Sequence, residues 1–251
     1  MGTTASWRRA SRCRPRSEPP VQGAPFLQFD LRGRRPHRRG VDMKGTSSHR
    51  SAGQLWASSH GAHIHRLDRS AYHQLAEGGA FEGRRVELID GVIIAKNSAG
   101  AHRAVTPLST QLLPRARRAR AVVTLNETLV PQVSGKARLR PALPLALSSL
   151  SEPVPDFAIV SLDESDDYPS TASLVIEVAD STRAFDLGLK ARLYAAAKLP
   201  EYWVVDLQTD KLVVHLEPRK GEYQRVRRFG KGREVTSSVA PKVTLKVATL
   251  F

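Results

Sequence analysis

The segment from Leu174 to Leu207 constrains the fold more than any other part of the chain. It opens with the apolar run Leu174 to Ile176, which predicts a short buried strand. A second apolar run, Tyr202 to Val205, predicts another strand. Between the two runs, apolar residues recur at the spacing of one helix face: Leu189, Leu193 and Ala197. The order strand, helix, strand indicates an α/β sheet, in which ligands bind beyond the ends of the strands.

Charged residues of this segment lie where such sheets bind ligands. Glu177 ends the first apolar run, and a carboxylate at the end of a buried strand is costly unless it is paired or binds a cation. Lys190 follows one turn into the expected helix, four residues after Asp186. Two simpler interpretations stay open. In the first, Glu177 is a buried acid paired with Arg183 or Lys190. In the second, Asp186 and Lys190 form an ordinary helix pair that stabilises the helix by about 0.3 kcal/mol.

A β-hairpin is indicated by the apolar strand Arg85 to Ile89, the turn pair Asp90-Gly91 and the second strand Val92 to Ile94. Asp-Gly between two apolar strands favours a two-residue type I′ turn. Glu87 lies between two apolar neighbours, so alternation puts it on the face opposite theirs. We interpret Glu87 first as a solvent-facing residue; the alternative is an acid that points into a site.

A further acid, Asp156, follows Pro155 and opens the apolar run Phe157 to Val160. It is a turn or strand-start residue by the simplest interpretation. Together, however, Glu87, Asp156 and Glu177 come from three expected strands and Lys190 from a helix. Carboxylate oxygens are the ligands that hard divalent ions prefer, and a nearby lysine can stabilise charge that develops on a phosphate. The set therefore predicts a hydrolytic metal site for phosphate esters.

Local spacing predicts the remaining elements with less detail. Arg115, Arg117, Arg118 and Arg120 form a basic run, which we interpret as a solvated helix face, with phosphate contact as the alternative. The other expected elements are a helix from Asp68 or Ser70 to Gly78-Gly79, a helix from His102 to about Arg118, a strand from Ala121 to Val130, one strand within residues 131–152, a meander at Lys211–His215 and Tyr223–Val226, and a strand-like tail at Val243–Leu250.

Composition bounds the class of protein. Hydrophobic residues make up 41% of the 251-residue chain, which suits one packed domain, and no apolar run reaches the length of a membrane span. The single cysteine, Cys13, excludes an internal disulfide framework and suits a reducing compartment, so we expect a cytoplasmic protein that does not enter membranes. The net charge of +15 attracts polyanions, nucleic acid above all.

Residues 1–65 are expected to be a disordered basic extension of a domain that spans residues 66–251. The first 60 residues hold twelve Arg and Lys residues against three acids, and they show no sustained hydrophobic period. Translation from a start upstream of the true one, with Met43 as a later start, belongs to the same interpretation. A transit peptide and a nucleic-acid-binding arm are the two alternatives.

Several short motifs occur in order along the chain: Glu87-Leu88-Ile89-Asp90-Gly91, Pro155-Asp156, Val175-Ile176-Glu177-Val178 with Ser181-Thr182, Asp186 and Lys190, and Glu201-Tyr202-Trp203-Val204-Val205-Asp206. Together these motifs resemble the Uma-two family of bacterial endonuclease-like proteins in the PD-(D/E)XK superfamily. The resemblance covers residues 66–251 and implies an α/β (α+β), restriction-endonuclease-like fold, with a central mixed β-sheet flanked by helices. It implies Mg²⁺ (or Mn²⁺) held by Asp156, Glu177 and Glu87.

One departure from the superfamily pattern concerns the lysine. A lysine is expected two residues after the second acid, but position 179 is Ala, and the resemblance makes Lys190 of the following helix its replacement. The implied function is a metal-dependent endonuclease that hydrolyses phosphodiester bonds of DNA, with Lys190, Glu177, Asp156 and Glu87 as catalytic residues and with a homodimer as one arrangement. The alternative is an inactive nucleic-acid-binding or structural protein that keeps the nuclease fold.

Overall fold

The computed structural model describes residues 65–95, 108–164, 167–239 and 241–251, so the extension expected over residues 1–65 lies outside the described part except for its last residue. The helical elements are α2 (Arg69–Glu77), α3 (Leu108–Val133), α4 (Arg183–Phe185), the π-helical turn η1 (Asp186–Lys190), α5 (Ala191–Ala196) and the 3-10 turn η2 (Val247–Leu250). The strands are β1 (Val86–Ile89), β2 (Val92–Ala95), β3 (Arg138–Pro141), β4 (Phe157–Val160), β5 (Leu174–Ala179), β6 (Glu201–Asp206), β7 (Lys211–Arg219), β8 (Glu222–Phe229), β9 (Glu234–Thr236) and β10 (Thr244–Lys246).

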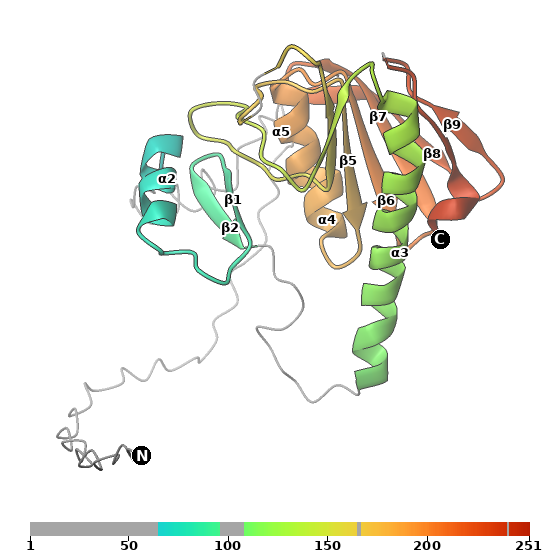
Figure 1. The fold of residues 1–251 in the computed structure, drawn as a ribbon, viewed down its shortest axis with the longest axis horizontal. Helices are drawn as coiled ribbons and strands as arrows, with labels where there is room; N and C mark the ends of the chain where they lie inside the picture. Colours follow the sequence, from blue (N-terminus) through green and yellow to red (C-terminus); the bar gives the residue numbers. More distant parts are fainter. Residues whose placement is uncertain (1–64, 96–107, 165–166, 240) are drawn as a thin grey trace, which may run out of the picture. The chain divides into compact units, whose positions relative to one another are not determined.

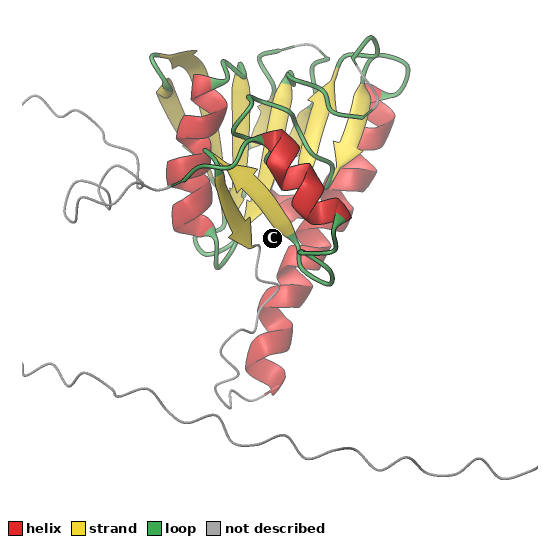
Figure 2. Ribbon diagram, turned by 90° about the vertical axis from the view of Figure 1, so that its left-hand side faces the viewer, coloured by secondary structure: helices red, strands yellow, loops and turns green. Residues whose placement is uncertain are grey.

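Six strands form a central mixed sheet in the order β3-β4-β5-β6-β7-β8 (Figure 1). β5 and β6 run parallel, and the other neighbouring strands of this sheet are antiparallel. A parallel pair needs a crossover connection, which α4, η1 and α5 supply between β5 and β6. The strand-helix-strand unit predicted from residues 174–207 is therefore confirmed. So is the mixed sheet flanked by helices, which lie in front of and behind the strands in Figure 2.

Side-chain alternation divides this sheet into two buried faces. In β5, Leu174, Ile176 and Val178 join the core cluster that contains the buried residues of α3. Val175 and Ala179 join the second cluster, which contains Ala191 and Tyr194 of α5. The residue between them, Glu177, therefore points toward α5, where an apolar side chain would be expected.

The strand predicted from Ala121 to Val130 is wrong, because these residues belong to α3, a helix of 26 residues. Ala121, Leu125, Leu129 and Val133 are buried at intervals of four residues, which is the period of a helix that packs against a sheet. The β-branched pair Val122-Val123 favoured a strand locally, but this tertiary packing decides the outcome. The helix predicted from His102 to Arg118 agrees with α3 from residue 108 onward, and residues 102–107 lie outside the described part.

The N-terminal elements of the domain agree with the prediction. The side chain of Asp68 caps α2 by accepting a hydrogen bond from the Ala71 backbone N–H at 2.8 Å. β1 and β2 form the expected hairpin, and Asp90 (φ 51°) and Gly91 (φ 74°) both have the positive φ of a type I′ turn. No described helix has the length and apolar character needed to cross a membrane.

The prediction of one strand within residues 131–152 is confirmed, and two predictions for the C-terminal part of the chain need a partial correction. β3 is the single named strand within residues 131–152 of the described chain, as expected. The meander is present as β7 and β8, longer than predicted. The tail is strand only over β10 and then turns into η2, although Val243, Leu245 and Val247 are all buried as their spacing indicated.

His215 on β7 is a buried titratable group on the α5 side of the sheet. Its side chain lies 5.2 Å from Tyr202, centroid to centroid, and its Nδ1 donates to the Tyr202 carbonyl oxygen at 3.3 Å. Burial lowers the pKa of His215 to about 4, although the hydrogen bond to Tyr202 opposes the shift; Arg228 lowers it further. The ring is therefore neutral near pH 7.

The low pKa of His215 predicts a loss of stability on acidification. Between pH 6.5 and pH 4 the unfolded chain binds the proton and the folded chain does not, so the free energy of unfolding falls as the pH falls through this window. The contribution is up to about 3 kcal/mol. Urea unfolding at several pH values should show a shallower fall for His215→Asn than for the parent protein. The exposed His65→Asn is the control, and parallel curves for His215→Asn and the parent would contradict the prediction.

Candidate active site

Asp156, which directly precedes β4, lies side by side with Glu177, which is within β5. β4 and β5 pair with Phe157 opposite Ile176, so the antiparallel register places Asp156 opposite Glu177. The Asp156 backbone N–H donates to Glu177 Oε2 at 3.3 Å, and Asp156 Oδ2 accepts from the Val178 backbone N–H at 2.7 Å. The two predicted acids are thus brought together, each bonded to the strand that carries the other.

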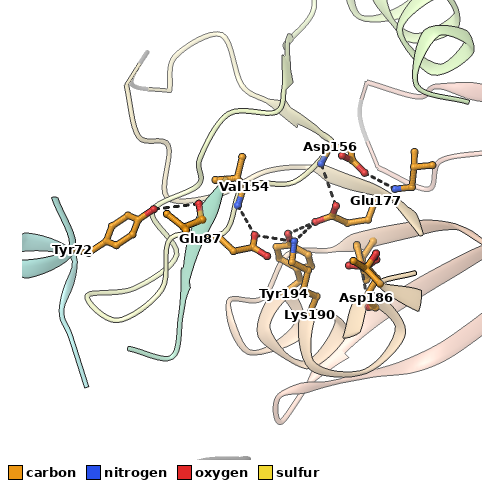
Figure 3. A network of polar contacts seen from close by, with 12 residues as sticks. Tyr72, Glu87, Val154, Asp156, Glu177, Asp186, Lys190 and Tyr194 are labelled. Carbon is orange, nitrogen blue, oxygen red and sulfur yellow. Dashed lines mark hydrogen bonds and ion pairs between the residues drawn. The ribbon is translucent and has the colours of Figure 1, made fainter. Parts of the chain in front are cut away.

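Lys190 reaches Glu177 from the helical crossover (Figure 3). Its Nζ lies 2.5 Å from Glu177 Oε1 and 3.0 Å from Glu87 Oε2, and its side chain is fully buried. Lys190 ends the π-helical turn η1, a kind of irregularity that is frequent at functional sites. Tyr194, four residues further on, donates its hydroxyl to the same Glu177 oxygen at 3.1 Å. We call Lys190, Glu87 and Glu177 the buried ion triad.

The solvent-facing interpretation of Glu87 is wrong, because its side chain is fully buried and points into the site. Leu88 of β1 exchanges two backbone hydrogen bonds with Glu152, so the hairpin lies against the segment that leads to Asp156. Alternation alone would leave the Glu87 face of β1 to water, but Lys190 and the chain at Val154 contact the Glu87 side chain on that face. Glu87 Oε2 also accepts from the Val154 backbone N–H at 3.0 Å, which fixes the carboxylate beside Lys190.

Lys190 remains an ammonium ion at neutral pH. Burial on its own lowers the pKa of Lys190, but Glu177 and then Glu87 raise it, together with the hydrogen bond to Glu177, and the net pKa lies above the ordinary value. Burial and the charge of Glu177 also raise the pKa of Tyr194, which therefore stays a hydrogen-bond donor. Neither side chain can take up a proton as a general base in this state.

Asp186 and Arg183 have other partners than the simpler interpretations gave them. The Asp186 carboxylate accepts a hydrogen bond from the Thr182 hydroxyl, while Lys190 turns to the two glutamates. Arg183 Nε donates to Asp206 Oδ2 at 2.7 Å. Of the alternatives left open for Glu177, the pairing with Lys190 is confirmed.

Arg118 is a site residue that the sequence interpretation missed. It donates to Asp156 Oδ1 at 2.6 Å and also to the Val178 carbonyl oxygen, and its side chain is 36% exposed. It was assigned to a solvated basic run, and its neighbour Arg117 does pair with Asp210 away from these acids. Helical spacing is the sequence signal that separates Arg118 from its basic neighbours. Arg118 lies three residues before the buried Ala121 and seven before the buried Leu125, so it shares their side of the helix.

A pocket of about 880 Å³ opens at these residues. Glu87, Asp156, Glu177 and Asp186 line it together with three arginines, Arg85, Arg115 and Arg118. Lys190 is not among the lining residues; it contacts Glu177 and Glu87 from the buried side. The volume is within the range of ligand sites, and the mixture of acids with arginines suits a cation together with an anionic substrate.

The donor chemistry of Asp156 and Glu177 fits a hard divalent cation. Both side chains offer only oxygen as a ligand, both line the pocket, and they lie opposite each other in the register of β4 and β5. In the described part of the chain, no three or more His, Cys, Asp or Glu side chains form a group ready to hold a metal ion. In this state the carboxylates have internal cations as partners, since Arg118 contacts Asp156 and Lys190 contacts Glu87 and Glu177.

Comparison with known proteins identifies the family. The model of the Uma2 (Uma-two) family, described as "Putative restriction endonuclease", matches residues 69–248. This chain belongs to the Uma2 family. The match includes every residue of the buried ion triad and Asp156, and the family membership predicted from the sequence is confirmed.

One solved structure similar to this Uma2 protein is a "putative nuclease belonging to DUF820 from Anabaena variabilis ATCC 29413". The two chains share 18% identity, the alignment covers 66% of this chain and 89% of the other, and the TM-score is 0.44. The curated proteins contain no match to this chain.

The buried ion triad makes a prediction about stability. Lys190→Met keeps the length of the side chain but leaves two buried carboxylates facing each other without the ammonium ion. Removing one member of a buried ionic group costs about 3–5 kcal/mol, so the free energy of unfolding should fall by that amount. Urea unfolding at pH 7 measures it. The exposed Lys211→Met should change it by less than about 0.5 kcal/mol, and a similarly small loss for Lys190→Met would refute the role of the triad.

Proposed function

We propose that this Uma2 protein is a metal-dependent endonuclease that hydrolyses phosphodiester bonds of DNA. The observation that carries the proposal is the juxtaposition of Asp156 and Glu177 at a pocket, with the Lys190 ammonium ion on Glu177. Membership of a family described as a putative restriction endonuclease supports it. The oxygen donors suit Mg²⁺, with Mn²⁺ as the alternative ion.

Asp156 and Glu177 would hold the ion, with Glu87 as a third carboxylate at the same pocket. A bound divalent ion supplies Lewis-acid charge to the phosphate oxygens and a position for the attacking water. The protein fixes the direction of the two ligands through backbone hydrogen bonds, from Val178 to Asp156 and from Asp156 to Glu177. Ligands fixed in this way need little reorganisation when the ion and the substrate bind.

Lys190 would aid the reaction as a fixed positive charge. Its ammonium ion is held by Glu177 and Glu87 and so lies next to the Glu177 carboxylate, which faces the substrate. This positive charge would favour the build-up of negative charge on the phosphate at that carboxylate. The raised pKa keeps this charge in place across the neutral range. Tyr194 holds Glu177 from the same helix face and so positions the carboxylate.

DNA fits the charge of this pocket and of the chain. Arg85, Arg115 and Arg118 line the pocket, and the whole chain carries a net charge of +15. Arginine binds phosphate through two parallel N–H groups, and basic surfaces attract the nucleic-acid backbone at any sequence. These contacts bring a phosphodiester to the carboxylates without selecting a base sequence.

A second candidate function is binding of nucleic acid without cleavage. The contact of Arg118 with Asp156 favours it, because a carboxylate that already carries an internal cation has less affinity for a metal ion. In that case the fold and the arginines bind DNA while the acids only support the structure. The two functions differ in one measurable respect, the cleavage of DNA in the presence of a divalent ion.

The nuclease proposal predicts cleavage of plasmid DNA in the presence of Mg²⁺ or Mn²⁺ and none in EDTA. Asp156→Asn and Glu177→Gln each keep the size of the side chain but remove a charged ligand, and each should lower the cleavage rate about 100-fold or more. The rate is measured from the loss of supercoiled plasmid on gels, with each variant purified in the same way.

Glu201→Gln is the matched control. Glu201 is a buried glutamate at the start of β6, bonded to Trp203 and Ser238, and it does not line the pocket. Its variant should cleave at the parent rate. Cleavage that survives in both Asp156→Asn and Glu177→Gln would exclude this site. DNA binding by a parent protein that cleaves with neither ion would support the second function.

A further inference from the structure

Arg118 joins two elements at the entrance of the site. It projects from α3, contacts the carboxylate of Asp156 through one terminal nitrogen and reaches the Val178 carbonyl oxygen through the other. One acceptor is charged and the other is neutral. With these two nitrogens, a guanidinium group can donate a bidentate pair of hydrogen bonds to a phosphate or a carboxylate.

The position of Arg118 is suited to a second partner. Its side chain lines the pocket and keeps 36% of its surface exposed, whereas Asp156 is 8% exposed. A long side chain at such an edge can turn toward a ligand in the pocket while its helix stays fixed by Ala121 and Leu125 in the core. Asp156, in contrast, is held by the Val178 backbone and cannot follow.

We propose that Arg118 is a substrate-binding residue that exchanges partners. In the free protein it neutralises Asp156, and in the complex it binds a backbone phosphate of the nucleic acid while a divalent cation takes its place at Asp156. This inference rests on the proposed function and names a role for a residue outside the predicted acids and lysine. No covalent change is involved, since only ionic and hydrogen-bond partners are exchanged.

The exchange couples two ligands. In the absence of nucleic acid, the cation has to displace Arg118 from Asp156, which weakens cation binding. A phosphate that attracts Arg118 removes this competition, and by linkage the cation strengthens nucleic-acid binding by the same factor. The protein would therefore bind the cation firmly only when substrate is present.

The test begins with Mn²⁺ alone, titrated calorimetrically into the intact protein. Arg118→Gln removes the competing charge and should bind Mn²⁺ about tenfold more tightly, or better, than the parent, because a hydrogen bond to a charged group is lost from the competing state. Arg117→Gln is the matched control, since it removes one charge from the next position of α3, where Arg117 pairs with Asp210 outside the pocket. It should leave the Mn²⁺ affinity unchanged.

The second measurement is the affinity for a short DNA duplex, by fluorescence anisotropy in EDTA and in Mn²⁺, with the duplex checked on a gel afterwards. In the parent, Mn²⁺ should tighten duplex binding about tenfold, and in Arg118→Gln this dependence should be several-fold smaller, because only the direct attraction between the ion and the phosphate remains. Arg118→Lys keeps the charge but not the planar fork, and should lie between the two; it also serves if Arg118→Gln does not fold.

The outcomes separate this inference from the nuclease proposal. Equal Mn²⁺ affinity in the parent, Arg118→Gln and Arg118→Lys would overturn the exchange, while metal-dependent cleavage by the parent would still stand. No Mn²⁺ binding by any variant, with or without duplex, would also overturn it. In that case the plasmid assay alone decides the proposed function.

Discussion

The ionic contact of Lys190 with Glu177 and Glu87 is the interaction on which the site depends. It joins the hairpin strand β1 to two elements far from it in the sequence, the central strand β5 and the helical crossover that follows β5. A buried ionic group is a weak source of net stability, because the cost of removing its charges from water offsets their attraction. Removing one member of the triad nevertheless lowers the stability strongly, because a buried charge is left without its partner. The triad therefore fixes where these segments meet more than it adds to the stability of the fold.

The sequence predicted those parts of the fold whose signals are local. The hairpin follows from Asp90-Gly91, since a two-residue turn leaves little freedom in how its strands pair. The crossover followed from apolar runs that are each buried in the expected element. Asp156 and Glu177 were predicted as partners because each lies at an end of an apolar run, and the register of β4 and β5 then brings them together.

The rest could not be predicted, because it depends on contacts between distant segments. Ala121 to Val130 contains β-branched residues, and only packing against the sheet makes it a helix. Glu87 is buried where Lys190 and the chain at Val154 contact its side chain, and nothing near Glu87 in the sequence indicates this cover. Arg118 looks like its neighbours in a basic run. Its distinct role depends on which face of α3 meets the sheet, which becomes known only once α3 is recognised as a helix.

The charges of the site explain why an arginine at its entrance is more than a surface residue. At the pocket wall, Asp186 adds a negative charge, and Arg85 and Arg115 add positive ones. Within the group in direct contact, with the carboxylates ionised, Glu87, Glu177 and Asp156 carry three negative charges against one positive charge on Lys190. Arg118 offsets part of this excess while the pocket holds no ligand. A divalent cation at Asp156 and Glu177 would offset more of it and would free Arg118, whose single charge matches that of one phosphodiester. From the buried lysine to the exposed arginine, the charges are positive on Lys190, negative on Glu177 and Asp156, and positive on Arg118. A cation between the two carboxylates and an anion beside the arginine would each meet opposite charge, so the two can enter together at a lower electrostatic cost than either alone.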